Sequence, residues 1–227
     1  MKILSWDVGI YNLSYCLLEK DENNNIKIID WNIVNLIDND SMKKNVNLIF
    51  ENIPRKLNEI PLLLDVDQVI IENQPSLKNP KMKSIQMILY SYFLILGKIM
   101  KNDHNIEKIE FCSASNKLKV YDGPEIILEK KVRKTKAKAK NTEGEIGVEE
   151  TVVEIEPTSV QEELLKKPKK GSAVKYADKK KLAIIHAQYF LEKHNPEYID
   201  FFNNNKKKDD LSDSYLQGLY WYKQIKK

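Results

Sequence analysis

Cysteine and glycine are both scarce in this sequence of 227 residues. The two cysteines, Cys16 and Cys112, each lie in a strand-like apolar run, and no Cys/His ligand spacing surrounds them. We therefore expect two buried free thiols in a reducing compartment, and neither a disulfide nor a zinc site. The chain has only seven glycines, and apart from the sequence Asp7-Val8-Gly9 it offers no second, Gly-rich segment that could bind a phosphate group.

Long hydrophobic runs are missing as well. The longest candidate, residues 85–100, is interrupted by Gln86, Ser91 and Lys98, so no membrane span and no membrane partner are expected. The opening residues 1–7 reach a charge too soon for the apolar part of a signal peptide. We expect an intracellular protein that begins with an intact strand.

The overall composition fits one globular domain with a mildly basic surface. Hydrophobic residues make up 42% and charged residues 31% of the chain, and the net charge is +4. This length can enclose one good-sized core. A small positive charge is compatible with a polyanionic partner without proving one.

Hydrophobic periodicity predicts an alternation of strands and helices along the chain. Three short strands joined by tight connections should form an antiparallel meander. The expected strands are residues 3–8, 14–18, 26–36, 67–72 and 106–112, and the expected helices are 41–59, 82–96, 176–193 and 209–222. The second helix is apolar around much of its girth, which suits packing on a sheet and against another subunit.

A charged segment interrupts this pattern at about 122–174. Residues 130–140 are basic, 143–163 acidic and 166–170 basic again, with few aromatic residues. Such composition indicates a solvated, flexible insertion without much core of its own. Without it, the order β-β-β-α-β-α-β-α-α predicts a single α/β domain over 1–227, with one mixed five-stranded sheet flanked by helices.

Four acidic residues stand where strand ends and a helix start could meet. Asp7 and Glu72 close the first and fourth predicted strands, and Asp210 and Asp213 open the last helix. The i, i+3 spacing puts the last two on one helical face, although Asp209 and Asp213 would share a face too. Taken singly, each is more often a cap, a turn residue or a solvated charge, except that Glu72, ending a buried strand, needs a partner.

Four such carboxylates in one pocket suit phosphodiester hydrolysis. Two divalent ions can supply a nucleophilic water and stabilise the leaving oxygen, and hard Mg²⁺ prefers carboxylate oxygens. We expect Asp7 to bridge two Mg²⁺ ions, and Glu72 and Asp213 to hold one or the other. Asp210 would orient or deprotonate the attacking water. Without metal, the carboxylates should raise one another's pKa values.

Three motifs in order carry a family resemblance. Residues 3–13 (ILSWDVGIYNL), 71–83 (IENQPSLKNPKMK) and 208–214 (KDDLSDS) resemble the motifs of viral Holliday-junction resolvases of the poxvirus and iridovirus type. These are relatives of bacterial RuvC and the fungal mitochondrial resolvases. The resemblance covers residues 1 to about 120 and 175 to 227, and the charged insertion departs from the compact members.

The resemblance implies a ribonuclease H-like fold and a Holliday-junction resolvase, a metal-dependent endonuclease active in DNA recombination and repair. It implies a homodimer, dependence on Mg²⁺ or Mn²⁺, and paired nicks across a four-way junction that leave 5′-phosphates. It makes Asp7, Glu72, Asp210 and Asp213 metal ligands, with Asp210 preferred to Asp209. It makes Lys117 the match for a functional lysine after the fifth strand. It also suggests a viral source, and hence the cytoplasm of a host cell.

Several residues near these motifs are candidates for contact with DNA phosphates. Lys78, Lys81 and Lys83 follow Glu72, and sequence-independent phosphate contact suits an enzyme that selects shape. A solvated loop explains any one of them equally well. Tyr11 and Asn12 follow the first strand and could touch the junction, although Tyr11 could equally pack in the hairpin. Lys175 and Lys179–Lys181 are mainly solubilising, with one or two left for DNA.

Two other classes of function stay open at this stage. An actin-like ATPase or sugar kinase also begins with Asp-x-Gly after a first strand, but it needs the second phosphate loop that is missing here. A non-catalytic junction-binding protein could keep the fold without cutting, although it would not need intact carboxylates. Within the nuclease class, a relative that cuts RNA:DNA hybrids is a further alternative.

Overall fold

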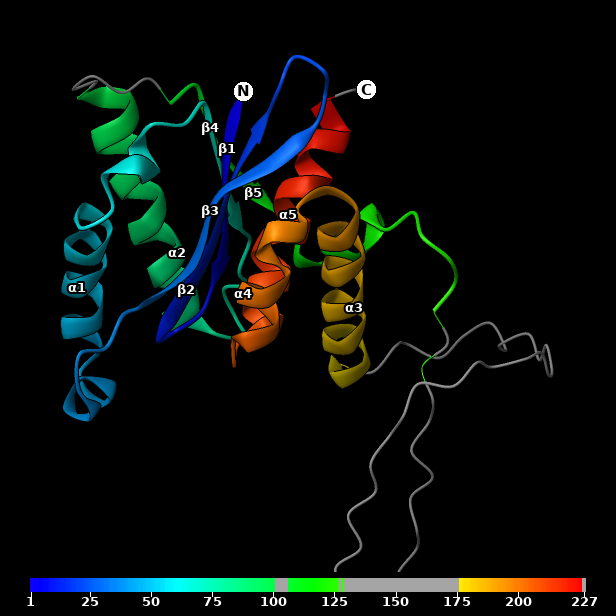
Figure 1. The fold of residues 1–227 in the computed structure, drawn as a ribbon. Helices are drawn as coiled ribbons and strands as arrows, with labels where there is room; N and C mark the ends of the chain where they lie inside the picture. Colours follow the sequence, from blue (N-terminus) through cyan, green and yellow to red (C-terminus); the bar gives the residue numbers. More distant parts are fainter. Residues whose placement is uncertain (101–105, 127, 129–175, 226–227) are drawn as a thin grey trace, which may run out of the picture. The chain divides into compact units, whose positions relative to one another are not determined.

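The computed structural model describes residues 1–100, 106–126, 128 and 176–225 (Figure 1). The chain divides into two compact units, Met1–Ile126 with Lys175–Lys227, and Ile127–Val174, and the architecture below is that of the first. The insertion predicted at about 122–174 lies almost entirely outside the described residues, so its flexibility stays a prediction. No described helix is both long and apolar enough to cross a lipid bilayer.

A five-stranded mixed sheet runs through this unit in the order β3-β2-β1-β4-β5. The strands are Lys2–Val8 (β1), Asn12–Lys20 (β2), Ile26–Asn35 (β3), Gln68–Glu72 (β4) and Lys108–Cys112 (β5). The first three pair antiparallel, which confirms the predicted meander, and β4 and β5 add parallel to the other side of β1. Every residue of β4 is buried, which is why its sequence is a nearly continuous apolar run.

Helices cover both faces of the sheet (Figure 1). α1 (Val46–Asn58) and α2 (Pro80–Phe93) cover one face, and α3 (Tyr176–His194) and α5 (Lys208–Ile225) cover the other. Each helical layer has its own hydrophobic core with the sheet. The predicted fold class, a five-stranded mixed sheet flanked by helices, is confirmed.

Strand alternation assigns each side chain of β1 to one of these two layers. Leu4, Trp6 and Val8 join the core under α1 and α2, whereas Ile3 joins the core under α5. Asp7 is two and four positions from Ser5 and Ile3, and it therefore shares the α5 face. The same alternation in β4 gives Glu72 the face of Ile70, which is also the α5 face.

The predicted elements are present, but several boundaries differ. The helix expected over 41–59 is divided into a 3₁₀ turn, η1 (Asp40–Lys44), and α1. Asn45 separates them because its backbone is extended (φ −121°) and its side chain caps the backbone N–H of Asn47. α2 continues into a π-helical segment, η3 (Leu94–Ile99).

Short elements without a periodic pattern were not predicted. They are η2 (Pro61–Leu64), η4 (Ala114–Val120), η5 (Pro196–Tyr198) and α4 (Ile199–Asn204). Each is too short to show a repeated apolar stripe, which is the main sequence signal for a helix. Cys16 and Cys112 are buried free thiols, as expected. His186 is a packing residue, as expected, because it stacks on Tyr121 with ring centroids 3.9 Å apart.

Candidate active site

The carboxyl ends of β1 and β4 bring two acidic side chains together. The strands are parallel neighbours, and Trp6 pairs with Ile71, so Asp7 and Glu72 are the next residues in register. Both side chains point to the α5 face. They are largely enclosed, with 14% and 11% of their side-chain surfaces exposed.

A lysine from η4 lies between these carboxylates and a third one from α5. Lys117 Nζ is 2.7 Å from Asp7 Oδ1, 3.3 Å from Glu72 Oε1 and 3.1 Å from Asp213 Oδ2. The Lys117 side chain is only 4% exposed. Four elements that are distant in the sequence thus meet at one ammonium group. We call Asp7, Glu72, Asp213 and Lys117 the carboxylate–lysine cluster.

The electrostatics of the cluster follow from burial and from its excess of negative charge. Burial raises the pKa of Glu72 to about 8, and the charge of Asp7 adds to this, while Lys117 opposes it. Burial also raises the pKa of Asp213, to about 6. Burial alone would lower the pKa of Lys117, but its three carboxylate neighbours outweigh this and raise it. Lys117 is therefore charged at neutral pH. One ammonium does not balance three carboxylates, so a bound cation would be electrostatically favourable in the cluster.

The two aspartates at the start of α5 differ in their surroundings. Burial favours a higher pKa for Asp209, but the 2.5 Å hydrogen bond from Lys180, the charge of Lys180 and backbone hydrogen bonds together outweigh burial and leave the pKa lowered. The pKa of Asp210 is raised by burial and by the charges of Asp209 and Asp7, and its nearest cation is Lys207 at 3.5 Å. Asp209 is thus tied to α3, whereas Asp210 is close enough to the cluster to sense the charge of Asp7.

Buried glutamines surround the cluster and were not singled out from the sequence. Gln74 Nε2 donates to Glu72 Oε2 at 2.8 Å, and the Gln74 backbone N–H donates to Gln86 Oε1 at 2.8 Å. Gln217 lies fully buried on α5, one turn after Asp213. Its signal in the sequence is an uncharged polar residue next to the inner apolar stripe of that helix.

The candidate DNA contacts lie around the same end of the sheet, but they differ in solvent exposure and in how far they already bond within the protein. Lys78 and Lys81 are exposed, and Tyr11 is 36% exposed. Asn12 begins β2 and is partly buried. Lys83 donates to Asn73 Oδ1 and Gln86 Oε1, and its ammonium lies 5.3 Å from the centre of the Phe111 ring. Lys83 is therefore already engaged within the protein.

The donor set suits a hard divalent cation. Three carboxylates from separate elements already converge on one positive charge, and carboxylate oxygens are the ligands that Mg²⁺ and Mn²⁺ prefer. As arranged around Lys117, no three His, Cys, Asp or Glu side chains of the described residues enclose a metal-sized site.

Comparisons with known proteins identify the fold. No family model matches the sequence. The chain is 33% identical over 174 residues to protein L451 of Acanthamoeba polyphaga mimivirus, which is described as uncharacterized; the match covers 75% of this chain and 33% of that protein. The chain thus spans about a third of the length of this relative.

Solved structures of two resolvases match nearly the whole chain. The fowlpox virus resolvase, solved with its substrate Holliday-junction DNA, has a TM-score of 0.55 and 18% identity, and each chain is covered fully. The yeast mitochondrial Holliday junction resolvase has a TM-score of 0.56 and 15% identity, with 99% of this chain and 81% of that chain covered. The chain therefore has the ribonuclease H-like fold of these resolvases.

Proposed function

We propose that this protein is a Holliday-junction resolvase, a metal-dependent endonuclease that cuts four-way DNA junctions. The observation that carries the proposal is the convergence of Asp7, Glu72 and Asp213 on Lys117 at one end of a resolvase-like fold. Structural packing alone gives no reason to gather three carboxylates in one pocket, where burial raises the pKa of Glu72 and of Asp213.

The carboxylates of Asp7, Glu72 and Asp213 would hold Mg²⁺ or Mn²⁺, with Asp210 beside them. Two bound divalent ions would supply an ionised water at neutral pH and offset charge on the leaving oxygen. Asp210 suits a proton acceptor for that water, because its pKa is already raised by burial and by its acidic neighbours. Lys117 would keep the carboxylates together before a cation binds.

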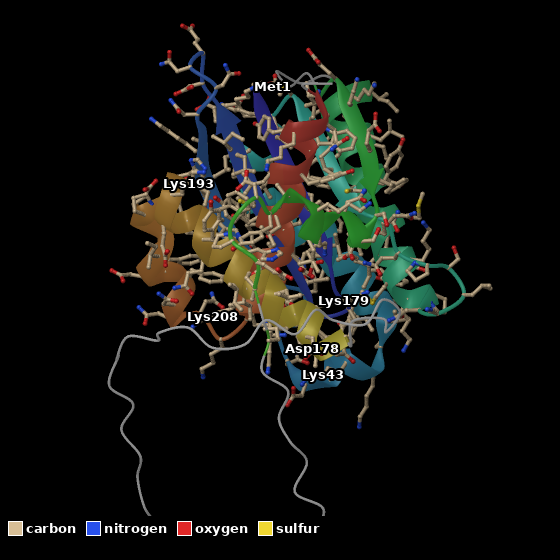
Figure 2. All side chains as sticks on the ribbon, turned by 90° about the vertical axis from the view of Figure 1, so that its right-hand side faces the viewer. Met1, Lys43, Asp178, Lys179, Lys193 and Lys208 are labelled. Carbon is tan, nitrogen blue, oxygen red and sulfur yellow. The ribbon has the colours of Figure 1, made fainter. Side chains whose placement is uncertain are left out.

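The charge around this end of the sheet fits a DNA backbone. Figure 2 shows Met1 at one end of the unit and Lys43, Lys179 and Lys208 toward the opposite end, to which β1 runs. The exposed Lys78 precedes α2 and the exposed Lys81 lies in its first turn, whereas Tyr11 and Asn12 lie where the chain turns from β1 into β2. Contacts to phosphates carry no base sequence, so they suit an enzyme that recognises branched shape.

Paired nicks on opposing strands need two sites, and α2 offers an apolar surface for a second copy. Met87, Ile95, Ile99 and Met100 are between 42% and 65% exposed along α2 and η3 and just beyond them. They adjoin an apolar groove between α1 and α2, which Pro54, Met87 and Tyr92 help to line. A contiguous exposed apolar surface of this kind is typical of a protein–protein interface. We propose a homodimer that buries this surface.

Cleavage of a synthetic four-way junction beside a linear duplex of matched sequence tests the function. Wild-type protein in Mg²⁺ or Mn²⁺ should nick the junction in pairs and leave the duplex intact. An RNA:DNA hybrid added as a third substrate distinguishes a junction enzyme from a hybrid nuclease.

Single variants Asp7→Asn, Glu72→Gln and Asp213→Asn should abolish cutting while junction binding persists. Asp200→Asn is the matched control, because Asp200 is an exposed aspartate on the same face of the sheet and outside the cluster. Cutting at the control's rate by any of the three cluster variants would refute the proposed site.

A further inference from the structure

α5 carries Asp213, and most of its contact with the sheet is apolar. Leu211, Tyr215, Leu219 and Tyr222 are buried in the core that α5 shares with the sheet. Hydrophobic contact is non-directional, so these four residues stabilise the packing of α5 on the sheet without fixing the helix position to a fraction of an ångström. Placement of the Asp213 carboxylate needs directional bonds in addition.

Gln217 supplies such bonds next to the cluster. Its side chain is fully buried, and Nε2 is 3.1 Å from Ser5 Oγ, 3.1 Å from the Trp6 carbonyl and 3.4 Å from the Ile70 carbonyl. Trp6 directly precedes Asp7, and Ile70 lies two residues before Glu72. One carboxamide thus ties the helix of Asp213 to both strands that carry the other carboxylates.

The neighbouring residue makes this close approach possible. A Cβ atom on Gly218 would lie 2.6 Å from Leu18 Cδ1 and 3.3 Å from Ser5 Cβ. A larger residue would push the helix away from β1 and β2, and the Gln217 carboxamide would lose its carbonyl partners. Other bonds between α5 and the sheet each reach one strand: Ser214 Oγ lies 3.0 Å from Ser14 Oγ of β2, Trp31 Nε1 of β3 donates to Leu211 O at 3.2 Å, and Trp221 Nε1 donates to Gln68 Oε1 of β4 at 2.9 Å.

We propose that Gln217 is a positioning residue, which sets the separation between Asp213 and the pair Asp7 and Glu72 through its bonds to β1 and β4. The inference rests on the proposed function, because that separation matters only where the three carboxylates share bound cations. A carboxamide suits this task since it donates to strand carbonyls without adding charge beside the carboxylates.

The test compares Gln217→Met with Tyr222→Phe. Methionine is of similar length and fills the space, but it cannot donate to Trp6 or Ile70. Tyr222 is the matched control, because its hydroxyl also donates to strand-side carbonyls, Met1 O at 2.8 Å and Leu18 O at 3.0 Å, from the far end of the same helix. Both variants lose buried bonds, and only the first loses bonds beside the carboxylates.

Gln217→Met should retain junction affinity in the absence of divalent metal. Its single-turnover cleavage rate should fall about tenfold to a hundredfold, because a misplacement of about 1 Å can cost that much. The Mn²⁺ concentration for half-maximal thermal stabilisation should rise, a readout that needs no cleavage. Gln217→Glu, studied near pH 6 where a buried carboxyl keeps its proton, retains one donor and should recover part of the rate.

The outcomes separate the two proposals. At equal folded fraction, Tyr222→Phe should cut the junction and bind Mn²⁺ like the wild type. If Tyr222→Phe and Gln217→Met lose cleavage rate and Mn²⁺ response equally, the positioning role of Gln217 is overturned. A wild-type Mn²⁺ response and rate in folded Gln217→Met would overturn it too. Should Gln217→Met not fold, Gln217→Glu near pH 6 decides by the same comparison with Tyr222→Phe. A wild-type protein that binds Mn²⁺ and never cuts a junction would sink the proposed function and leave the positioning role standing.

Discussion

Replacing Lys117 by methionine should destabilise the metal-free protein strongly. Methionine keeps most of the side-chain volume but removes the ammonium that bonds Asp7, Glu72 and Asp213. Removing one partner of a buried ion pair costs about 3–5 kcal/mol, since it leaves uncompensated charge in the interior. For a domain of this size, each kcal/mol lowers Tm by about 2–4 °C, so a loss of roughly 10 °C is expected.

The loss should depend on pH and on metal. Glu72 can take up a proton to relieve the repulsion, because its pKa is already about 8 with Lys117 present. Thermal unfolding in EDTA should therefore show a larger deficit at pH 8 than at pH 6. Mn²⁺ should restore more stability to Lys117→Met than to wild type, because the cation replaces the missing charge.

Lys180→Met is the control for this experiment. It removes an ion pair with Asp209 whose side chains are 43% and 28% exposed, and such pairs contribute about 1 kcal/mol or less. If Lys117→Met in EDTA at pH 8 unfolds at the same temperature as Lys180→Met, the view that Lys117 neutralises a strained carboxylate pocket is refuted.

Three further predictions concern Glu72, Gly218 and Asn195. Because the folded-state pKa of Glu72 is raised to about 8 from an ordinary 4.5, folding takes up a proton between these values and metal-free stability falls as pH rises. From pH 6 to pH 8, we expect a loss of roughly 2 kcal/mol in denaturant titrations of the wild type. Glu72→Gln should lose much less, because only the smaller shift of Asp213 then contributes; an equal loss in this variant would refute the assignment to Glu72. Gly218→Ala should cost about 1–3 kcal/mol, because its Cβ would meet Leu18; unchanged stability would show that α5 shifts freely. Asn195→Ala should cost about 1–3 kcal/mol by leaving the buried Ile28 N–H without its 2.8 Å acceptor, measurable as faster amide exchange at that position.

Much of the fold could be predicted because its signals are local and periodic. β1 to β3 have short connections, and antiparallel pairing of successive strands is the simplest arrangement. β4 shows its burial on both faces in three consecutive apolar residues, Val69–Ile71. The position of Asn45 as a helix cap was missed, since a polar residue between two helical patterns is indistinguishable by periodicity from one on a solvated face.

The site was predictable only as a set of residues, and its geometry was not. Strand ends, a helix start and the motif resemblance selected Asp7, Glu72, Asp210 and Asp213, and the resemblance alone selected Lys117. No spacing rule reveals that this lysine contacts Asp7, Glu72 and Asp213 together. That arrangement depends on η4, a turn too short to carry a periodic signal. Gln217 was missed for a related reason, because its partners are backbone carbonyls, which leave no trace in a sequence.

The pairing of the first strand with the last helix has a consequence for biosynthesis. Ser5 and Gln217 are 212 positions apart, yet they are hydrogen-bonded across the middle of the unit. A ribosome therefore makes β1, the central strand, long before it makes α5, the helix that covers this strand. Until α5 is made, the face of β1 and β2 that it covers stays exposed, and the candidate site lacks Asp213; such exposed apolar surface makes a growing chain prone to aggregation.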